Sequence, residues 1–402
     1  MTGRHGFVSS SAPVAGAVFL LTGPRQVFFP PLPPETSAPP CSAPFFGGIV
    51  TPLGTAFEQA VARLLDEAGV AAVVHSQEDG DARRYSLRPE YAQRWLPDDD
   101  SLGLRQRLLA AGTAEHELLQ REIVLSLLHS PVPYVFYCPE GPAAAVRVRR
   151  HIVEAARVTA LSFDTDAAER PSEAWRYDET TGFTVLPGVP LIDALTRATQ
   201  PTNGRRYAFS CYRATEYVIL LGLARELAAH NPDRLAMLQR QWETRAIMSR
   251  EFHDTFLDEH GSNEAPLPPR FYTPGDRVWF RNPDEASSDA TGYEGSWVFY
   301  LGGGLFSNFW HPERPYTLED KCLEIFHWRH GLYHDDAGEP CIDEDRVERR
   351  IAESHARPDE RDAILARMFR LRDLAGTYAD GGCIDRTREH PRCTCQTAPG
   401  SA

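Results

Sequence analysis

The sequence predicts an α+β fold, because helical patterns fill its first two thirds and strand-like segments follow them. Between residues 55 and 256, apolar side chains recur every three or four positions, as they do on the buried face of a helix. Between residues 277 and 310, short runs rich in aromatic and β-branched residues are separated by turn-forming residues. This order indicates a helical body packed on a small antiparallel sheet.

Composition excludes several classes of protein. The chain has 402 residues, of which 42% are hydrophobic and 24% charged, as expected of a globular protein. With 42 basic and 56 acidic residues the net charge is −14, which argues against nucleic-acid or membrane-surface partners. No apolar run approaches the ~18 residues that span a bilayer. Lys321 is the single lysine beside 41 arginines, a bias that either codon usage or avoidance of lysine explains.

The cysteines favour a cytoplasmic protein. Eight cysteines spread over 402 residues are too sparse for a disulfide scaffold, so we expect reduced thiols. Secretion is the alternative, since residues 14–21 resemble a weak signal-peptide core, but no convincing cleavage site follows them.

Four segments are expected along the chain. Residues 1–54 hold ten prolines and predict an extended arm. Residues 55–140 predict a helical region, residues 141–335 the domain that carries the chemistry, and residues 336–402 a helical, charged C-terminal extension.

The first helices follow from apolar spacing. One begins at Thr55, and a second is expected over 104–128, stopped by Pro131 and Pro133 before a short strand at 134–137. Further helices are expected over 143–163, 191–198, 211–228 and 231–256. The fifth of these six helices is almost entirely apolar from 217 to 224, so we expect it to be buried on nearly all sides.

The strands are bounded by turn chemistry. Pro274, Gly275 and Asp276 precede a strand at 277–281, and a polar loop leads to a second strand at 297–301. Three glycines then separate this strand from a third at 305–310. Thr317 and Asp320 predict the start of a further helix that runs through residue 328.

Cys211 is the candidate nucleophile. It lies in the first turn of the buried helix, with Ser210 at the N-cap. Free N–H groups and the helix dipole lower a thiol pKa at such a position. A cysteine at the start of a central helix that faces a small antiparallel sheet is the layout of papain-like cysteine enzymes. The alternative is a buried structural cysteine.

The neighbouring motifs resemble a known family. From about residue 143 to 330, the chain is similar to the bacterial spore-coat transglutaminases, which are protein-glutamine γ-glutamyltransferases. The resemblance is carried by four ordered segments, 207–221, 275–283, 295–302 and 305–308.

The resemblance implies an acyl transfer without cofactor or metal. The cysteine thiolate attacks the carboxamide of a protein glutamine, ammonia leaves, and a thioester forms. A lysine amine then attacks the thioester and gives an isopeptide crosslink. Protein substrates, one supplying glutamine and one supplying lysine, are therefore the expected partners.

The chain departs from the family at its supporting residues. Ser210 and Ser296 occupy the positions of the family's two glutamates, and Asn308 that of its histidine. Glu294 lies two residues before Ser296, and in an extended chain the two would face the same side, so Glu294 is the expected general acid/base. Asn308 is expected to orient a partner, and His311 is a further candidate.

Two other functions remain open. A cysteine amidase or peptidase on the same fold would need a histidine base, for which His253, His260, His311 and His327 are the candidates. A catalytically inactive binding protein would explain the departures from the family's residues.

The tail residues Cys383, His390, Cys393 and Cys395 match a zinc site poorly, so no metal is expected. Trp279, Trp297 and Trp310 are expected either to wall a water-poor cleft or to lie in the core.

Overall fold

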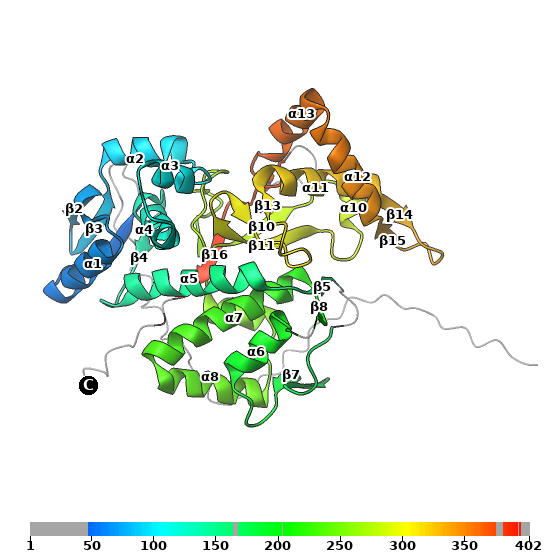
Figure 1. Ribbon diagram of the computed structural model, residues 1–402, viewed down its shortest axis with the longest axis horizontal. Coiled ribbons are helices and arrows are strands. Elements are labelled where there is room, and N and C mark those ends of the chain that lie inside the picture. Colours follow the sequence, from blue (N-terminus) through cyan, green and yellow to red (C-terminus); the bar gives the residue numbers. More distant parts are fainter. Residues whose placement is uncertain (1–46, 164–167, 203, 375–380, 393, 395–402) are drawn as a thin grey trace, which may run out of the picture.

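The computed structural model describes residues 47–163, 168–202, 204–374, 381–392 and 394. It combines helices with two main sheets, as the α+β expectation requires (Figure 1). A four-stranded sheet belongs to the N-terminal part, and a six-stranded sheet carries the candidate site. Within the described residues, no helix is long and apolar enough to cross a membrane.

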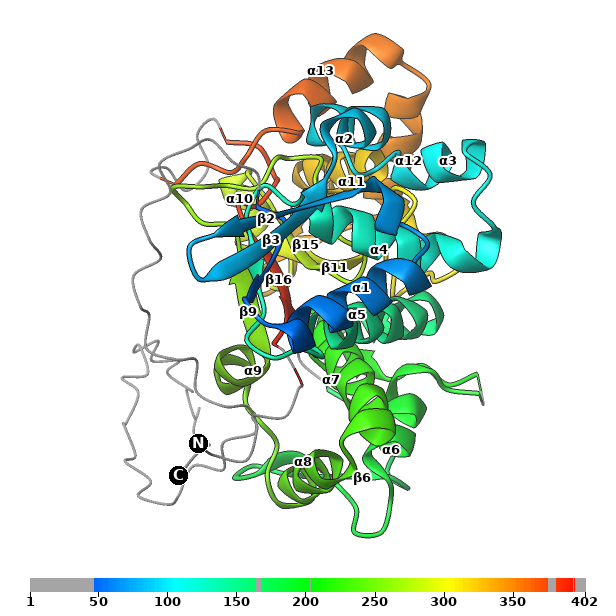
Figure 2. The same ribbon diagram turned by 90° about the vertical axis from the view of Figure 1, so that its left-hand side faces the viewer.

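The N-terminal part is not purely helical, which corrects the expectation for residues 55–140. Its sheet has the strand order β2-β3-β1-β4, and Figure 2 shows α1 and α4 packed beside it. The hairpin β2–β3 turns at Gly80, whose φ of 64° suits a tight hairpin. Only Tyr85 and Leu87 of β3 are buried, so the alternation of apolar residues is too sparse to mark a strand.

The bounds of this part also refine two other expectations. Strand β1 shows that the end of the expected proline-rich arm pairs within the sheet, whereas residues 1–46 lie outside the described residues. The helix expected over 104–128 is two helices, because the chain turns at Gly112, whose φ is 88°. The elements are β1 Ile49–Pro52, α1 Thr55–Glu67, β2 Val74–Asp79, β3 Ala82–Leu87, α2 Pro89–Trp95, α3 Leu104–Ala110, α4 Leu118–His129 and β4 Tyr134–Val135.

The central helices surround α7, which runs from Cys211 to His230 as predicted. Helices α5 and α6 pack on it, and it forms the middle of the largest apolar cluster. Gly222 allows the close approach of α5, because a Cβ there would lie 2.7 Å from Ile152 Cγ1. The surrounding elements are α5 Gly141–Val158, β5 Ser162–Phe163, β6 Trp175–Asp178, β7 Gly182–Val185, α6 Leu191–Thr199 and β8 Ala208–Phe209.

The long helix expected over 231–256 is also divided. Asn231 caps its start as predicted, accepting from the backbone N–H of Arg234. Near residue 246 the Ala246 N–H donates to the Thr181 carbonyl instead of continuing a helix. The result is α8 Pro232–Thr244 and α9 Ser249–Phe256.

The six-stranded sheet has the order β13-β12-β11-β10-β16-β9. Strand β16 comes from the C-terminal segment and lies between β10 and β9. The extension over 336–402 is therefore not only helical, because one of its strands is an inner strand of this sheet. The strands are β9 Leu257–His260, β10 Arg277–Arg281, β11 Gly295–Gly302, β12 Leu305–Phe306, β13 Tyr316–Thr317 and β16 Arg388–Pro391.

Strand β11 divides two apolar clusters. Its Phe299 and Leu301 pack with α7, whereas Val298 and Tyr300 pack with α11 on the opposite face. Thr317 and Asp320 form the predicted capping box of α11. The remaining elements are α10 Glu285–Ser288, α11 Leu318–Gly331, β14 Leu332–His334, β15 Pro340–Ile342, α12 Glu344–His355 and α13 Pro358–Met368.

The cysteines do not all match the expectation of reduced thiols. Cys211, Cys322, Cys341 and Cys383 are free. Cys138, however, is disulfide-bonded, so the expectation does not hold at that position.

Candidate active site

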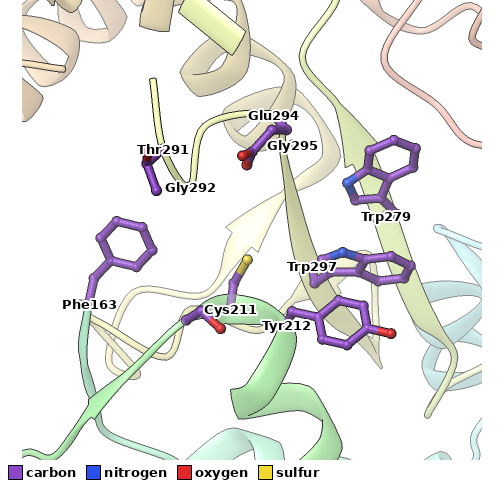
Figure 3. Close-up of a pocket in the computed structure, with 10 residues that line it drawn as sticks. Phe163, Cys211, Tyr212, Trp279, Thr291, Gly292, Glu294, Gly295 and Trp297 are labelled. Atoms are coloured by element: carbon purple, nitrogen blue, oxygen red, sulfur yellow. The ribbon is translucent and has the colours of Figure 1, made fainter. Parts of the chain in front are cut away.

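A pocket of about 360 Å³ opens where the N-terminus of α7 meets β11. The Cys211 sulfur points into this pocket (Figure 3). The walls come from the loop before β11, from β10 and β11, and from the end of β5. The lining residues are Phe163, Ser210, Cys211, Tyr212, Trp279, Thr291, Gly292, Glu294, Gly295 and Trp297.

Local sequence fixes the position of Cys211. Ser210 is extended and its hydroxyl accepts from the Arg213 N–H at 3.3 Å, which starts α7 at Cys211. The predicted N-cap is therefore confirmed. Ser210 itself lines the pocket, but its hydroxyl is engaged in capping.

The backbone of β11 also contacts the sulfur. Strand β12 pairs with β11 only from Tyr300 onward. The Phe299 N–H donates to Ser307 Oγ on the β12 side, and Trp297, two residues earlier, directs its N–H toward the same side. There the edge of β11 is open, and the N–H of Trp297 donates to the Cys211 sulfur.

The pKa of the Cys211 thiol differs from the sequence expectation. Burial raises it above its ordinary value, because the sulfur at the bottom of the pocket loses hydration. The N–H of Trp297 opposes this rise most, followed by the charges of Lys321 and Arg277 and the N–H of Tyr212. The helix start was expected to give a thiol of lowered pKa. In the structure, desolvation outweighs the local donors and cations, so the expectation was wrong.

Aromatic rings wall the pocket. Trp279 and Trp297 stack with centroids 5.9 Å apart, and Tyr212 meets Trp297 edge-on at 5.5 Å. Phe163 faces them across the pocket (Figure 3). Gly295 makes room for the Trp279 ring, because a Cβ there would overlap the ring and lie 2.6 Å from the Phe280 carbonyl oxygen. These contacts confirm a cleft role for Trp279 and Trp297.

Trp310 is placed differently from the other two tryptophans. It is absent from the pocket lining and packs edge-on against Phe163 at 5.3 Å, so it supports a wall residue from behind.

A buried cation lies behind the aromatic wall. The Arg277 guanidinium lies 4.2 Å from the Tyr212 ring centroid and 4.1 Å from that of Trp297. It donates to Thr215 Oγ1 at 2.8 Å and pairs with Glu389 of β16 at 2.7 Å. Glu389 in turn contacts His253 at 3.3 Å. The sequence patterns did not predict a role for Arg277, although Arg277, Trp279 and Arg281 alternate on one face of a strand.

Glu294 is brought to the site. It is exposed, lines the pocket, and its carboxylate and the Cys211 sulfur face the space between them (Figure 3). In the described part of the chain, its carboxylate forms no hydrogen bond or ion pair. A substrate group held between the carboxylate and the sulfur would meet both.

Ser296 does not share this space, which corrects the expectation that it faces the same side as Glu294. Glu294 precedes β11, so the alternation of a strand does not apply to it. Ser296 lies within β11 and accepts from Lys321 Nζ at 3.3 Å on the face that packs with α11.

Asn308 and His311 are absent from the pocket lining. Asn308 is buried and holds its own loop, donating to the Arg314 carbonyl and accepting from the N–H groups of Trp310 and His311. The His311 side chain is 54% exposed and contacts Glu313 at 3.5 Å. Neither side chain is therefore placed to act on Cys211.

The histidines of the amidase alternative are engaged elsewhere. His260 contacts Ser130 Oγ, and His327 contacts Ser354 Oγ, each at 2.8 Å. His253 pairs with Glu389. None of the histidines that the structure describes lines the pocket.

The tail residues give no support for zinc in the described ranges. Within residues 47–163, 168–202, 204–374, 381–392 and 394, no group of His, Cys, Asp and Glu has the arrangement of a metal site. Cys383 instead contacts the Cys322 sulfur at 3.3 Å, and His390 lies half-buried in β16 beside Tyr134. Cys393 and Cys395 lie outside the described residues.

Comparison with known proteins extends the region of similarity. A family model described as protein-glutamine gamma-glutamyltransferase matches residues 104–376, more than half of the chain and more than the 143–330 expected. Among solved structures, the chain is similar to the transglutaminase from Geobacillus stearothermophilus without its C-terminal extension. The identity is 21% over 46% of this chain and 84% of that chain, with a TM-score of 0.34. No curated protein matches.

Proposed function

Because the chain belongs to the protein-glutamine gamma-glutamyltransferase family, we propose that it transfers the acyl group of a protein glutamine to a lysine amine through a Cys211 thioester. The observation that carries the proposal is the placement of the Cys211 sulfur at the start of α7, facing the Glu294 carboxylate in an aromatic pocket. The α7 helix packed on an antiparallel sheet also supports a papain-like core.

Acylation begins with removal of the thiol proton. Since burial raises the pKa of Cys211, the resting thiol needs a base, and the Glu294 carboxylate is placed to accept the proton. The sulfur attacks the glutamine carboxamide carbon, and the carbonyl oxygen becomes an oxyanion. The N–H groups of Trp297 and Tyr212 lie next to the sulfur, where they stabilise the negative charge of this oxyanion. Glu294 then returns the proton to the departing ammonia, leaving the thioester.

Deacylation uses Glu294 in the same order, first as base and then as acid. Glu294 takes a proton from the incoming lysine amine, and the nitrogen attacks the thioester carbon. The carbon–sulfur bond then breaks, Glu294 returns the proton to the Cys211 sulfur, and an isopeptide bond is left. The rings of Phe163, Trp279 and Trp297 reduce access of water to the thioester. Aminolysis is therefore favoured over hydrolysis.

An amine-incorporation assay tests this mechanism. Wild type should attach a fluorescent primary amine to a glutamine-bearing protein, Cys211→Ala should attach none, and Glu294→Gln should be about 10²–10⁴ times slower. Incorporation that survives Cys211→Ala would refute the proposal. Wild type that releases ammonia without taking up amine would instead indicate an amidase, although the pocket lining includes none of the described histidines.

A matched control makes the Glu294 result specific. Glu285 is an exposed carboxylate at the start of α10, outside the pocket lining. Glu285→Gln should leave incorporation within about twofold of wild type, because surface substitutions away from the site have small effects. Equal losses from Glu285→Gln and Glu294→Gln would remove the support for Glu294 as the acid/base.

A further inference from the structure

Lys321 is buried on the face of β11 opposite the nucleophile, although lysine side chains are rarely buried. It is 3% exposed, its Nζ lies 3.6 Å from the centre of the Tyr316 ring, and it pairs with Glu324 one turn along α11. The chain uses arginine for all its other 41 basic residues. At this position it holds a compact ammonium instead of a planar guanidinium.

Lys321 and Cys211 approach the same end of β11 from opposite faces. Cys211 takes the N–H of Trp297, at the open edge of the strand. Lys321 donates to the hydroxyl of Ser296, the residue directly before Trp297. The sulfur and the ammonium therefore contact two consecutive residues of β11, Trp297 and Ser296.

We propose that Lys321 is a positioning residue whose charge, set by its pairing with Glu324, stabilises the Cys211 thiolate through the start of β11. The inference rests on the proposed role of Cys211 as nucleophile. Of the charged side chains around the sulfur, Lys321 favours the thiolate most and Arg277 comes next.

Of the other charges near the sulfur, those of Arg277 and Glu216 are compensated by ion pairs, whereas that of Glu294 is not. Arg277 from β10 is paired with Glu389 of β16 at 2.7 Å. Within α7, Glu216 is paired with Arg213 at 2.7 Å. From the loop before β11, Glu294 faces the sulfur and opposes a thiolate.

The groups around Lys321 are mainly acidic. Glu324 also accepts from the Tyr316 hydroxyl at 3.1 Å. Burial raises the pKa of Tyr316 well above its ordinary value, and the charges of Glu324, Glu344 and Glu348 add to this. Tyr316 therefore stays neutral, and Glu324 is the group that directly offsets the Lys321 charge.

Two substitutions should shift the reactivity of Cys211 in opposite directions. Lys321→Met removes the cation, so the thiol pKa should rise and alkylation by iodoacetamide at pH 7 should slow roughly tenfold. Glu324→Gln leaves the cation and the Tyr316 contact but removes the opposing charge, so alkylation should become faster. Arg240→Met, which removes an exposed cation on the distant α8, should change nothing.

The rate is read at Cys211 by peptide mass spectrometry over pH 6 to 10, with the partly exposed Cys341 as an internal reference. An unchanged pH profile in Lys321→Met would overturn the inference, and so would shifts of both variants in the same direction. If Lys321→Met does not fold, Glu324→Gln alone decides, because an unchanged or slower rate contradicts the role of Lys321. Wild type that is alkylated but transfers no amine would refute the proposed function and leave this inference intact.

Discussion

Replacing Arg277 by methionine should lower the stability of the protein, because Arg277 supports the aromatic wall of the pocket. The side chain is 1% exposed, and its loss would leave the Glu389 carboxylate, itself 13% exposed, without its 2.7 Å partner. Breaking a buried ion pair by removing one partner costs about 3–5 kcal/mol. The hydrogen bond to Thr215 and the contacts with two aromatic rings are lost as well.

The measurement is thermal unfolding followed by tryptophan fluorescence, in which Arg277→Met should lower the apparent Tm by about 4–6 °C. Glu389→Gln combined with Arg277→Met removes both charges, so the double variant should recover more than half of the loss. Arg277→Lys should be intermediate, because lysine keeps the charge but not the planar contact with the rings. An Arg277→Met variant within about 2 °C of wild type, or a double variant that is strictly additive, would refute this reasoning.

Three further predictions follow from contacts away from the nucleophile. Burial lowers the pKa of His260 to about 3 and that of His327 to about 4, while both titrate near 6.5 when unfolded. Below pH 6.5 these two histidines gain protons in the unfolded protein but stay neutral in the folded one, so stability is lost as the pH falls toward 4. The Tm should therefore drop between pH 7 and pH 5. A Tm that rises over this range would contradict the prediction. His311→Ala should leave amine incorporation within about twofold of wild type, because the side chain lies outside the pocket; a tenfold loss would restore it as a candidate. Gly222→Ala should cost about 1–3 kcal/mol in urea unfolding through overlap with Ile152, and adding Ile152→Ala should recover part of it; equal stability would contradict the close packing.

The sequence was sufficient where structure depends on neighbouring residues. Ser210 as a cap and the apolar stretch after it predicted α7 within two residues of its observed end. The strands at 277 and 297 and the capping box at Thr317 were found by the same local signals. Cys211 and Glu294 were also found, and both line the pocket.

Pairing between segments that are far apart in the chain could not be predicted from local sequence signals. Strand β16 joins residues near 260 and 277, more than a hundred residues earlier, and its own sequence is too polar to indicate an inner strand. Lys321 is close to the site only because α11 packs on the opposite face of β11 from α7. The raised pKa of Cys211 likewise depends on how deeply the folded protein surrounds the sulfur.

The burial of Lys321 has a consequence for how such a catalyst would behave among its products. The chain's single lysine is 3% exposed, with its amine engaged by Glu324 and Ser296. On the proposed function, an acyl-enzyme therefore meets no lysine on the surface of another copy, so copies of the catalyst are not joined to one another through this side chain. Lysine-directed dyes should therefore leave Lys321 unmodified until the protein unfolds.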